Sequence, residues 1–173
     1  MGLHQGEELV ALGWIGGLSP RFMKILVDAD ACPVKEEVYK VAWRHDVSVI
    51  IVSNSPIRVP AHPLIERVVV SDGFDAADDW IAERAGADVI CITADILLAD
   101  RCLKAGAVVI APTGKPFTLS SIGAAIATRA IMADLRAGAV GDPIGGPAPF
   151  SKVDRSRFLS ALDEALVRLK RGR

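Results

Sequence analysis

The stretch Lys24-Ile-Leu-Val-Asp-Ala-Asp30, followed directly by Ala31-Cys32-Pro33, decides how this chain is expected to fold. Its apolar, β-branched residues are typical of a buried strand. Asp28 and Asp30 stand at the C-terminal end of that strand, and because strand side chains alternate between faces, both are expected to point the same way. Pro33 suits the first residue of a helix, since its fixed φ matches that position. In open α/β sheets, ligands bind where strands end in this manner.

Two carboxylates at such a place have two interpretations. Like charges held close together are unfavourable unless a cation or a proton relieves them, which predicts a binding site. The alternative is a solvated turn in which Asp30 only caps the next helix. The stretch by itself leaves both interpretations open.

The composition indicates one globular domain. The chain has 173 residues, of which 51% are hydrophobic and 24% charged, enough for a sizeable core. Its net charge of −1 gives no overall attraction to nucleic acid or anionic lipid. Charge is nevertheless uneven, since residues 72–100 carry eight acids and one base, and residues 152–173 carry seven bases and three acids. The basic end is either a binding surface or an ordinary solvated helix.

Cysteine and histidine usage narrows the class of protein. The three cysteines form no CxxC pair, which favours a reducing cytoplasm and disfavours a disulfide framework. The three histidines lack ligand spacing, so a zinc hydrolase is disfavoured. Residues 1–22 contain a glycine-broken apolar run that is too short for a membrane span. We therefore expect a loosely ordered extension over 1–22, a single domain over 23–173, and no membrane association.

The remaining chain alternates apolar strands with amphipathic helices. Strands are predicted at 47–52, 68–70, 88–93 and 107–110, and helices at 33–45, 75–85, 96–104 and 119–137, with a last helix from Asp154 or Ser156 to about 170. This order predicts an α/β three-layer sandwich with a central, mainly parallel sheet of about five strands. The glycine- and proline-rich connection 138–151 is expected to fold over the acidic residues and bring Phe150, Lys152 and Arg155 to their rim.

Acidic residues recur where the predicted strands end. Asp28 and Asp30 follow the first strand, Asp75, Asp78 and Asp79 follow the third, and Asp95 follows the fourth. Several carboxylates without histidine or cysteine suit a hard cation, Mg²⁺ or Mn²⁺, which activates water for phosphodiester cleavage. Thr93 and Asn54 are placed to position water or a phosphate oxygen. The alternative is that Asp75 and Asp95 are only helix caps.

Five segments of the chain resemble a known family. "KILVDADACPVKEEVYKVA", "NSPIRVP", "VVVSDGFDAADDWIAERA", "ICITADILLA" and "GGPAPFSKVDRSRFLSALDEAL" are similar to the YaiI/YqxD family of uncharacterised bacterial proteins, from about Met23 to the C-terminus. That family resembles a divergent branch of the PIN-like nuclease fold. The resemblance implies a metal-binding acidic pocket made by Asp28, Asp30, Asp75, Asp79 and Asp95. It also implies pocket or lid roles for Lys35, Arg58, Arg129 and residues 146–151. Where the family usually has an acid after Arg129, this chain has Ala130.

The expected function is a Mg²⁺- or Mn²⁺-dependent phosphodiesterase, a PIN-like ribonuclease that acts on RNA or another phosphate-containing substrate. Asp28, Asp30, Asp75 and Asp95 are its expected catalytic residues. The expected substrate-binding residues are Lys35, Asn54, Arg58, Thr93, Arg129, Phe150, Ser151 and Arg155. The sequence leaves the metal, the substrate and the oligomeric state open.

Three alternatives remain. A haloacid-dehalogenase-like small-molecule phosphatase would use the Asp-x-Asp of residues 28–30 with Asp95 and Asp100, although no Thr or Val follows at the usual place. A thiol enzyme would use Cys32 at a helix N-terminus, where a thiolate is stabilised, although no histidine is near in sequence. A non-catalytic RNA-binding module would use the basic tail.

Overall fold

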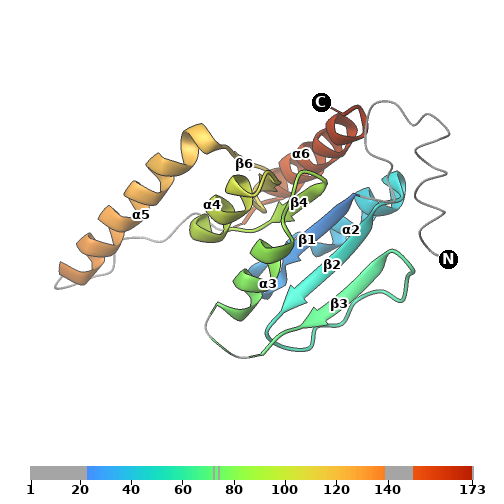
Figure 1. The fold of residues 1–173 in the computed structure, drawn as a ribbon, viewed down its shortest axis with the longest axis horizontal. Coiled ribbons are helices and arrows are strands. Elements are labelled where there is room, and N and C mark those ends of the chain that lie inside the picture. The colour runs from blue at the N-terminus through green and yellow to red at the C-terminus, as the bar shows by residue number, and fades with distance from the viewer. Residues whose placement is uncertain (1–22, 72, 74, 139–149, 173) are drawn as a thin grey trace.

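The computed structural model describes residues 23–71, 73, 75–138 and 150–172 (Figure 1). Its centre is a six-stranded sheet in the order β3-β2-β1-β4-β5-β6. The strands are β1 (Lys24–Asp28), β2 (Ser48–Ser53), β3 (Ile65–Val69), β4 (Val89–Ile92), β5 (Val108–Ile110) and β6 (Pro116–Phe117). The helices are the 3₁₀ turn η1 (Ala29–Ala31), α2 (Lys35–His45), α3 (Ala76–Arg84), α4 (Ile96–Lys104), α5 (Leu119–Gly138) and α6 (Lys152–Lys170).

The sheet is parallel from β1 to β5, as predicted. The chain runs outward from β1 to β3 and then resumes at β4, on the other side of β1. This reversal makes β1 and β4 the switch point of the sheet. The sixth strand, β6, pairs antiparallel with β5 and was missed, because two residues show no detectable periodicity.

Helices cover both faces of the sheet, which confirms the three-layer prediction. α2 and α6 pack on one face, while α3, α4 and the start of α5 pack on the other (Figure 1). Alternation along β1 divides its side chains between the layers: Ile25 and Val27 join the α2 and α6 core, and Leu26 joins the α3 and α4 core. Asp28 follows the parity of Leu26 and is therefore directed toward α3 and α4.

Several predicted boundaries were wrong by two to four residues. Pro33 is not the first residue of α2, which begins at Lys35 after Val34. β3 begins at Ile65, three residues before the predicted start. The start was missed because Glu66 and Arg67 of this edge strand are exposed and break the hydrophobic pattern. α6 begins at Lys152, since Ser151 forms a capping box with Asp154.

α5 extends away from the rest of the protein (Figure 1). Ile122, near its start, is buried, and Thr118 Oγ1 accepts a hydrogen bond from the Ser121 N–H. Ile131 and Leu135, further along, are exposed. None of the described helices is both long and apolar enough to cross a lipid bilayer.

Candidate functional site

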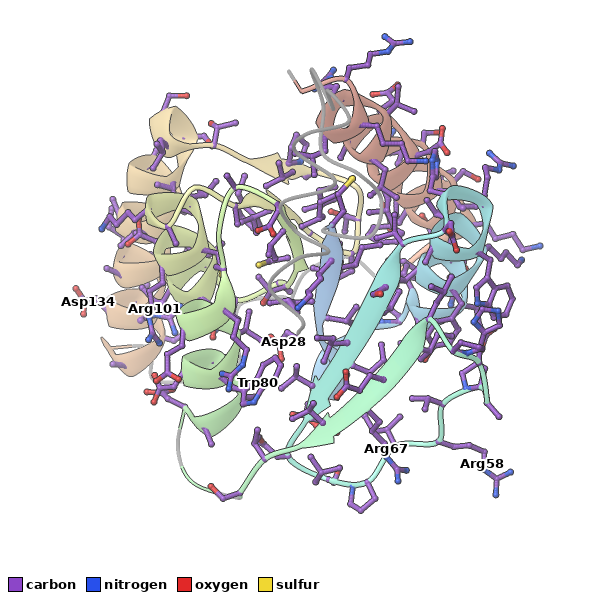
Figure 2. All side chains as sticks on the ribbon, turned by 45° about the vertical axis from the view of Figure 1, so that its right-hand side comes forward. Asp28, Arg58, Arg67, Trp80, Arg101 and Asp134 are labelled. Atoms are coloured by element: carbon purple, nitrogen blue, oxygen red, sulfur yellow. The ribbon has the colours of Figure 1, made fainter. Side chains whose placement is uncertain are left out.

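A cavity of about 440 Å³ opens at the C-terminal ends of β1 and β4. This is the switch point of the sheet, where open α/β proteins bind ligands. Figure 2 shows Asp28 at the end of β1, on the side where α3 and α4 lie. The described residues that line the cavity include no base. The polar side chains among them are Asp28, Asp30, Asn54, Asp75, Asp78 and Asp95.

Asp28 is held by a short hydrogen-bonded chain. The buried Thr93 donates its Oγ1 hydrogen to Asp28 Oδ2 over 2.9 Å, and the Asp95 N–H donates to Thr93 Oγ1 over 3.0 Å. Burial raises the pKa of Asp28 above 3.8; the Thr93 hydrogen bond opposes this, and the charges of Asp30 and Asp95 reinforce it. The strand register explains the contact, because Val27 pairs with Ile92 and the next residues are therefore neighbours.

Asp30 reaches the same cavity by a different route from the one predicted. β1 ends at Asp28, and Asp30 lies in the turn η1, so strand alternation is the wrong reason for their shared direction. The backbone N–H of Asn54 donates to both oxygens of Asp30, at 3.2 and 3.0 Å. The turn after β1 is thus tied to the end of β2, and this contact places the second carboxylate.

The two proposed helix caps behave differently. Asp95 caps α4, since its Oδ1 accepts hydrogen bonds from the N–H groups of Leu97 and Leu98. Asp75 occupies the N-cap position of α3 but makes no side-chain cap bond, and its φ of 63° is left-handed. A non-glycine residue in that region is uncommon and carries backbone strain. Capping therefore explains Asp95 and does not explain Asp75.

Asp78 is the cavity residue that was left out of the predicted site. The pKa of Asp78 is raised to about 6, first by burial and then by the charges of Asp95, Asp28 and Asp75, with Arg101 opposing. Asp79, which was predicted instead, does not line the cavity and binds Arg101 at 2.9 Å. The packing of α3 separates them, because Asp78 is half-buried beside the buried Ala77 whereas Asp79 is exposed.

Most of the predicted substrate-binding residues lie outside the cavity. Lys35 Nζ donates to the Cys32 carbonyl oxygen over 2.8 Å, and Arg129 is exposed on α5. Arg58 lies in the β2–β3 loop, where it lines a separate open hollow with Arg67. Figure 2 shows both of these arginines beyond β3, away from Asp28.

The expected lid is described only at its ends. Residues 139–149 lie outside the described residues. Arg155 donates to the Pro33 carbonyl oxygen and to Glu37 Oε1, and its guanidinium lies 5.0 Å from the centre of the Phe150 ring. Ser151 is occupied as the cap of α6. These contacts hold the start of α6 on the turn before α2, and they do not line the cavity.

Two alternative chemistries find little support. Burial raises the pKa of the Cys32 thiol, which is the opposite of an activated thiolate. Asp100, the later acid of a phosphatase-like set, binds Lys104 at 2.8 Å and does not line the cavity.

The donor atoms of the cavity fit a hard cation without forming a closed cage. Among the described residues, no three His, Cys, Asp or Glu side chains are grouped so that they could hold a metal ion. Mg²⁺ in enzymes is commonly bound by one or two carboxylates, with water and substrate phosphate completing its coordination. The oxygen-only lining is compatible with that open type of site.

Comparison with known proteins assigns the family. The profile described as "Uncharacterized BCR, YaiI/YqxD family" matches residues 26–168. The chain belongs to the YaiI/YqxD family. A UPF0178 protein of Sphingopyxis alaskensis is 78% identical over 148 residues, which cover 86% of this chain and 96% of that relative. A second, from Nitrobacter winogradskyi, is 62% identical over 150 residues, which cover 87% of this chain and 94% of that relative.

No solved structure matches this YaiI/YqxD-family chain. The link to the PIN-like nuclease fold therefore stays an expectation from resemblance, while the α/β sandwich itself is observed.

Proposed function

We propose that this YaiI/YqxD-family protein is a Mg²⁺- or Mn²⁺-dependent phosphodiesterase that cleaves RNA. The observation that carries the proposal is the gathering of five carboxylates in one cavity at the sheet's switch point, with no base among the described lining residues. Helix capping and solvated turns would account for single residues. They do not account for the partly buried Asp28, or for Asp75, whose side chain makes no capping hydrogen bond to α3.

Electrostatics supports a cation in this cavity. The pKa values of Asp28 and Asp78 are both raised, first by burial and then by the charges of the neighbouring carboxylates. A divalent cation would remove that repulsion. Since it would bind only the folded protein, it would stabilise the fold by RT ln(1 + [L]/Kd).

The residues divide the work by their existing contacts. Asp28 accepts the Thr93 hydrogen bond with Oδ2, and Asp95 caps α4 with Oδ1. Asp28 and Asp95 therefore each keep one carboxylate oxygen for a ligand. The Asn54 N–H orients Asp30. A bound Mg²⁺ or Mn²⁺ would supply a more acidic water and neutralise charge on the phosphodiester. Binding of the cation would lower the pKa of Asp78, because the charges of Asp95, Asp28 and Asp75 contribute, after burial, to its raised value in the metal-free protein.

Thermal melting with and without Mn²⁺ tests the proposal, together with cleavage of a fluorescent single-stranded RNA. Asp28→Asn keeps the side-chain shape and removes one charge. We expect it to fold, to lose the Mn²⁺-induced rise in melting temperature, and to lose cleavage. Asp79→Asn is the matched control, because it removes a neighbouring carboxylate that lies outside the cavity; it should keep both properties.

Several results would contradict the proposal. If Mn²⁺ does not change the melting temperature of the wild-type protein, the acidic residues serve only as helix caps and turn residues. Equal losses in Asp28→Asn and Asp79→Asn would show a general charge effect. Metal-dependent phosphate release from a small monoester, with RNA left intact, would favour the phosphatase alternative.

A further inference from the structure

We propose that the groove between α6 and the β5–β6 hairpin docks single-stranded RNA. The inference rests on the proposed function, because it names the surface that holds the substrate of the acidic cavity. The groove has a volume of about 820 Å³, larger than the acidic cavity. Such a volume is enough to hold a few nucleotides of one strand.

The groove has an apolar floor between polar walls. Its floor is made by Val108 and Ile110 of β5 and by Ala161 and Ala165 of α6. The polar wall residues are Thr113, Lys115, Ser156, Arg157, Ser160, Glu164 and Arg168. Three positive charges therefore face one negative charge.

The bases of the groove are free to bind a ligand. In the part of the chain that the structure describes, Lys115, Arg157 and Arg168 have no carboxylate within salt-bridge distance. Arg155 on the same helix is different, because it is bound to Glu37. Lys170 is also engaged, since its Nζ lies 2.8 Å from Nδ1 of His45. Within α6, Arg155 and Lys170 therefore contact α2, whereas Arg157 and Arg168 line the groove.

The acidic cavity needs such a surface. A phosphodiester that approaches five carboxylates is repelled by them, and no described lining residue of the cavity offers a positive charge. Most nucleic-acid affinity comes from phosphate contacts with Lys and Arg. Charge complementarity therefore assigns RNA binding to the groove and leaves the chemistry to the cavity.

The groove begins near the end of the sheet that carries the cavity, although the two lie on opposite faces: Val108 and Ile110 belong to the α2 and α6 side, and Asp28 is directed toward α3 and α4. The Arg155 guanidinium donates to the Pro33 carbonyl oxygen over 2.8 Å, which places the start of α6 beside the turn that follows Asp30. Ser156 and Arg157, the next residues, begin the groove. To reach the carboxylates, a strand bound along α6 would have to pass from that end around the C-terminal end of β1.

Hydroxyl groups favour RNA over other polyanions. Thr113, Ser156 and Ser160 can each donate and accept hydrogen bonds, as the ribose 2′-hydroxyl does. None of the lining residues that the structure describes has an aromatic ring for base stacking. We therefore expect binding that depends strongly on salt and weakly on sequence.

The test measures binding of a fluorescent 12-nucleotide single-stranded RNA to the full chain in EDTA, so that cleavage does not interfere. The groove variant carries Lys115→Gln, Arg157→Gln and Arg168→Gln. The control variant carries Lys24→Gln, Lys40→Gln and Arg171→Gln, which are exposed bases outside the groove.

Each phosphate contact contributes about 0.7 to the slope of log affinity against log salt. The groove variant should lose at least tenfold in affinity at low salt, and its slope should fall by about 2. The control should match wild type.

Ultraviolet crosslinking gives a second measurement that does not depend on the variants. Crosslinked peptides are expected from residues 113–116 and 156–168. Crosslinks confined to other segments would overturn the inference, as would groove and control variants that bind alike or a wild-type protein that does not bind. Equal binding of single-stranded DNA would refute the choice of RNA, and equal competition by polyglutamate of the same charge would indicate an acidic polypeptide as the partner.

Cleavage separates this inference from the proposed function. If the groove binds RNA but no Mn²⁺-dependent cleavage occurs, the phosphodiesterase proposal fails and the docking surface stands. If Asp28→Asn abolishes cleavage while the groove variant cleaves with an unchanged KM, the docking surface is wrong and the phosphodiesterase stands.

Discussion

At the scale of single residues, the carboxylates of the cavity differ in their hydrogen bonds and in their electrostatic surroundings. Asp28 and Asp95 each use one oxygen in a described hydrogen bond, whereas Asp78 is held at a raised pKa by burial and by its charged neighbours. Asp79, one position along α3, is instead neutralised by Arg101. Neighbouring residues of the same type therefore have opposite electrostatic surroundings.

Asp78 should make the metal-free protein less stable as pH rises. The folded-state pKa of about 6 exceeds the ordinary 3.8, so the folded protein binds the proton more tightly than the unfolded chain between about pH 4 and 6. This stabilisation is complete below about pH 4 and is lost as pH rises through 6. Asp78→Asn should therefore gain stability at pH 7, by about 1 kcal/mol after allowance for solvent screening of a partly exposed group.

Urea unfolding in EDTA at pH 4 and pH 7 measures this difference. The gain of Asp78→Asn should be present at pH 7 and nearly absent at pH 4. Asp79→Asn should show no gain at pH 7, because it loses its contact with Arg101. A gain in both variants would mean that overall acidity, and not the cavity, sets the effect.

At the scale of elements, the short β5–β6 hairpin depends on one close approach. Gly114 has a φ of +88°, and a Cβ at this position would lie 2.6 Å from the backbone carbonyl carbon of Arg157. A helix backbone cannot yield as the tip of a side chain can. Only glycine lets this turn pack against α6.

Gly114→Ala should therefore lower the free energy of unfolding by about 2–3 kcal/mol, through backbone strain and displacement of α6. Thermal or urea unfolding measures the loss. Gly123→Ala is the matched control, because a Cβ added there would meet no atom within 4 Å and alanine favours a helix. That variant should be neutral or slightly more stable. A neutral Gly114→Ala would show that the hairpin and α6 are less closely packed than described.

The outer half of α5 should exchange its amide hydrogens quickly. Residues 127–138 are exposed apart from the half-buried Met132, and helices of this length are marginal in water without packing. Hydrogen exchange should show much weaker protection there than in α6, whose Phe158 and Leu162 are fully buried. Strong protection over 127–138 would show that another surface covers Ile131 and Leu135.

At the scale of the whole molecule, the two helical layers share one sheet and should unfold together. Trp43 lies on α2 and Trp80 lies on α3, so each reports on a different layer. Phe158→Ala, in the α2 and α6 core, should cost about 3–5 kcal/mol. The measurement uses variants that keep only Trp43 or only Trp80 as the fluorescent probe. Phe158→Ala should lower the melting midpoint by the same amount with either probe. A lower midpoint at Trp43 alone would mean that the layers unfold separately.

Local sequence patterns were enough to predict the α/β class, the parallel sheet, the two helical layers and four of the five carboxylates that line the cavity. Apolar strands that alternate with amphipathic helices require parallel pairing, and polar residues at the ends of parallel strands gather at one edge. Phe158, Leu162, Leu166 and Leu169 are all buried, and they recur at the spacing of one helix face.

Which side chains actually meet depends on how the elements pack against one another. Asp78 enters the cavity in place of Asp79 because packing of α3 sets the rotation of that helix, to within a single residue. Asp30 arrives through a bond to Asn54, 24 positions away in sequence, and Arg155 is drawn to Glu37 on another helix. These contacts depend on distances between elements, and a local sequence pattern contains no information on such distances.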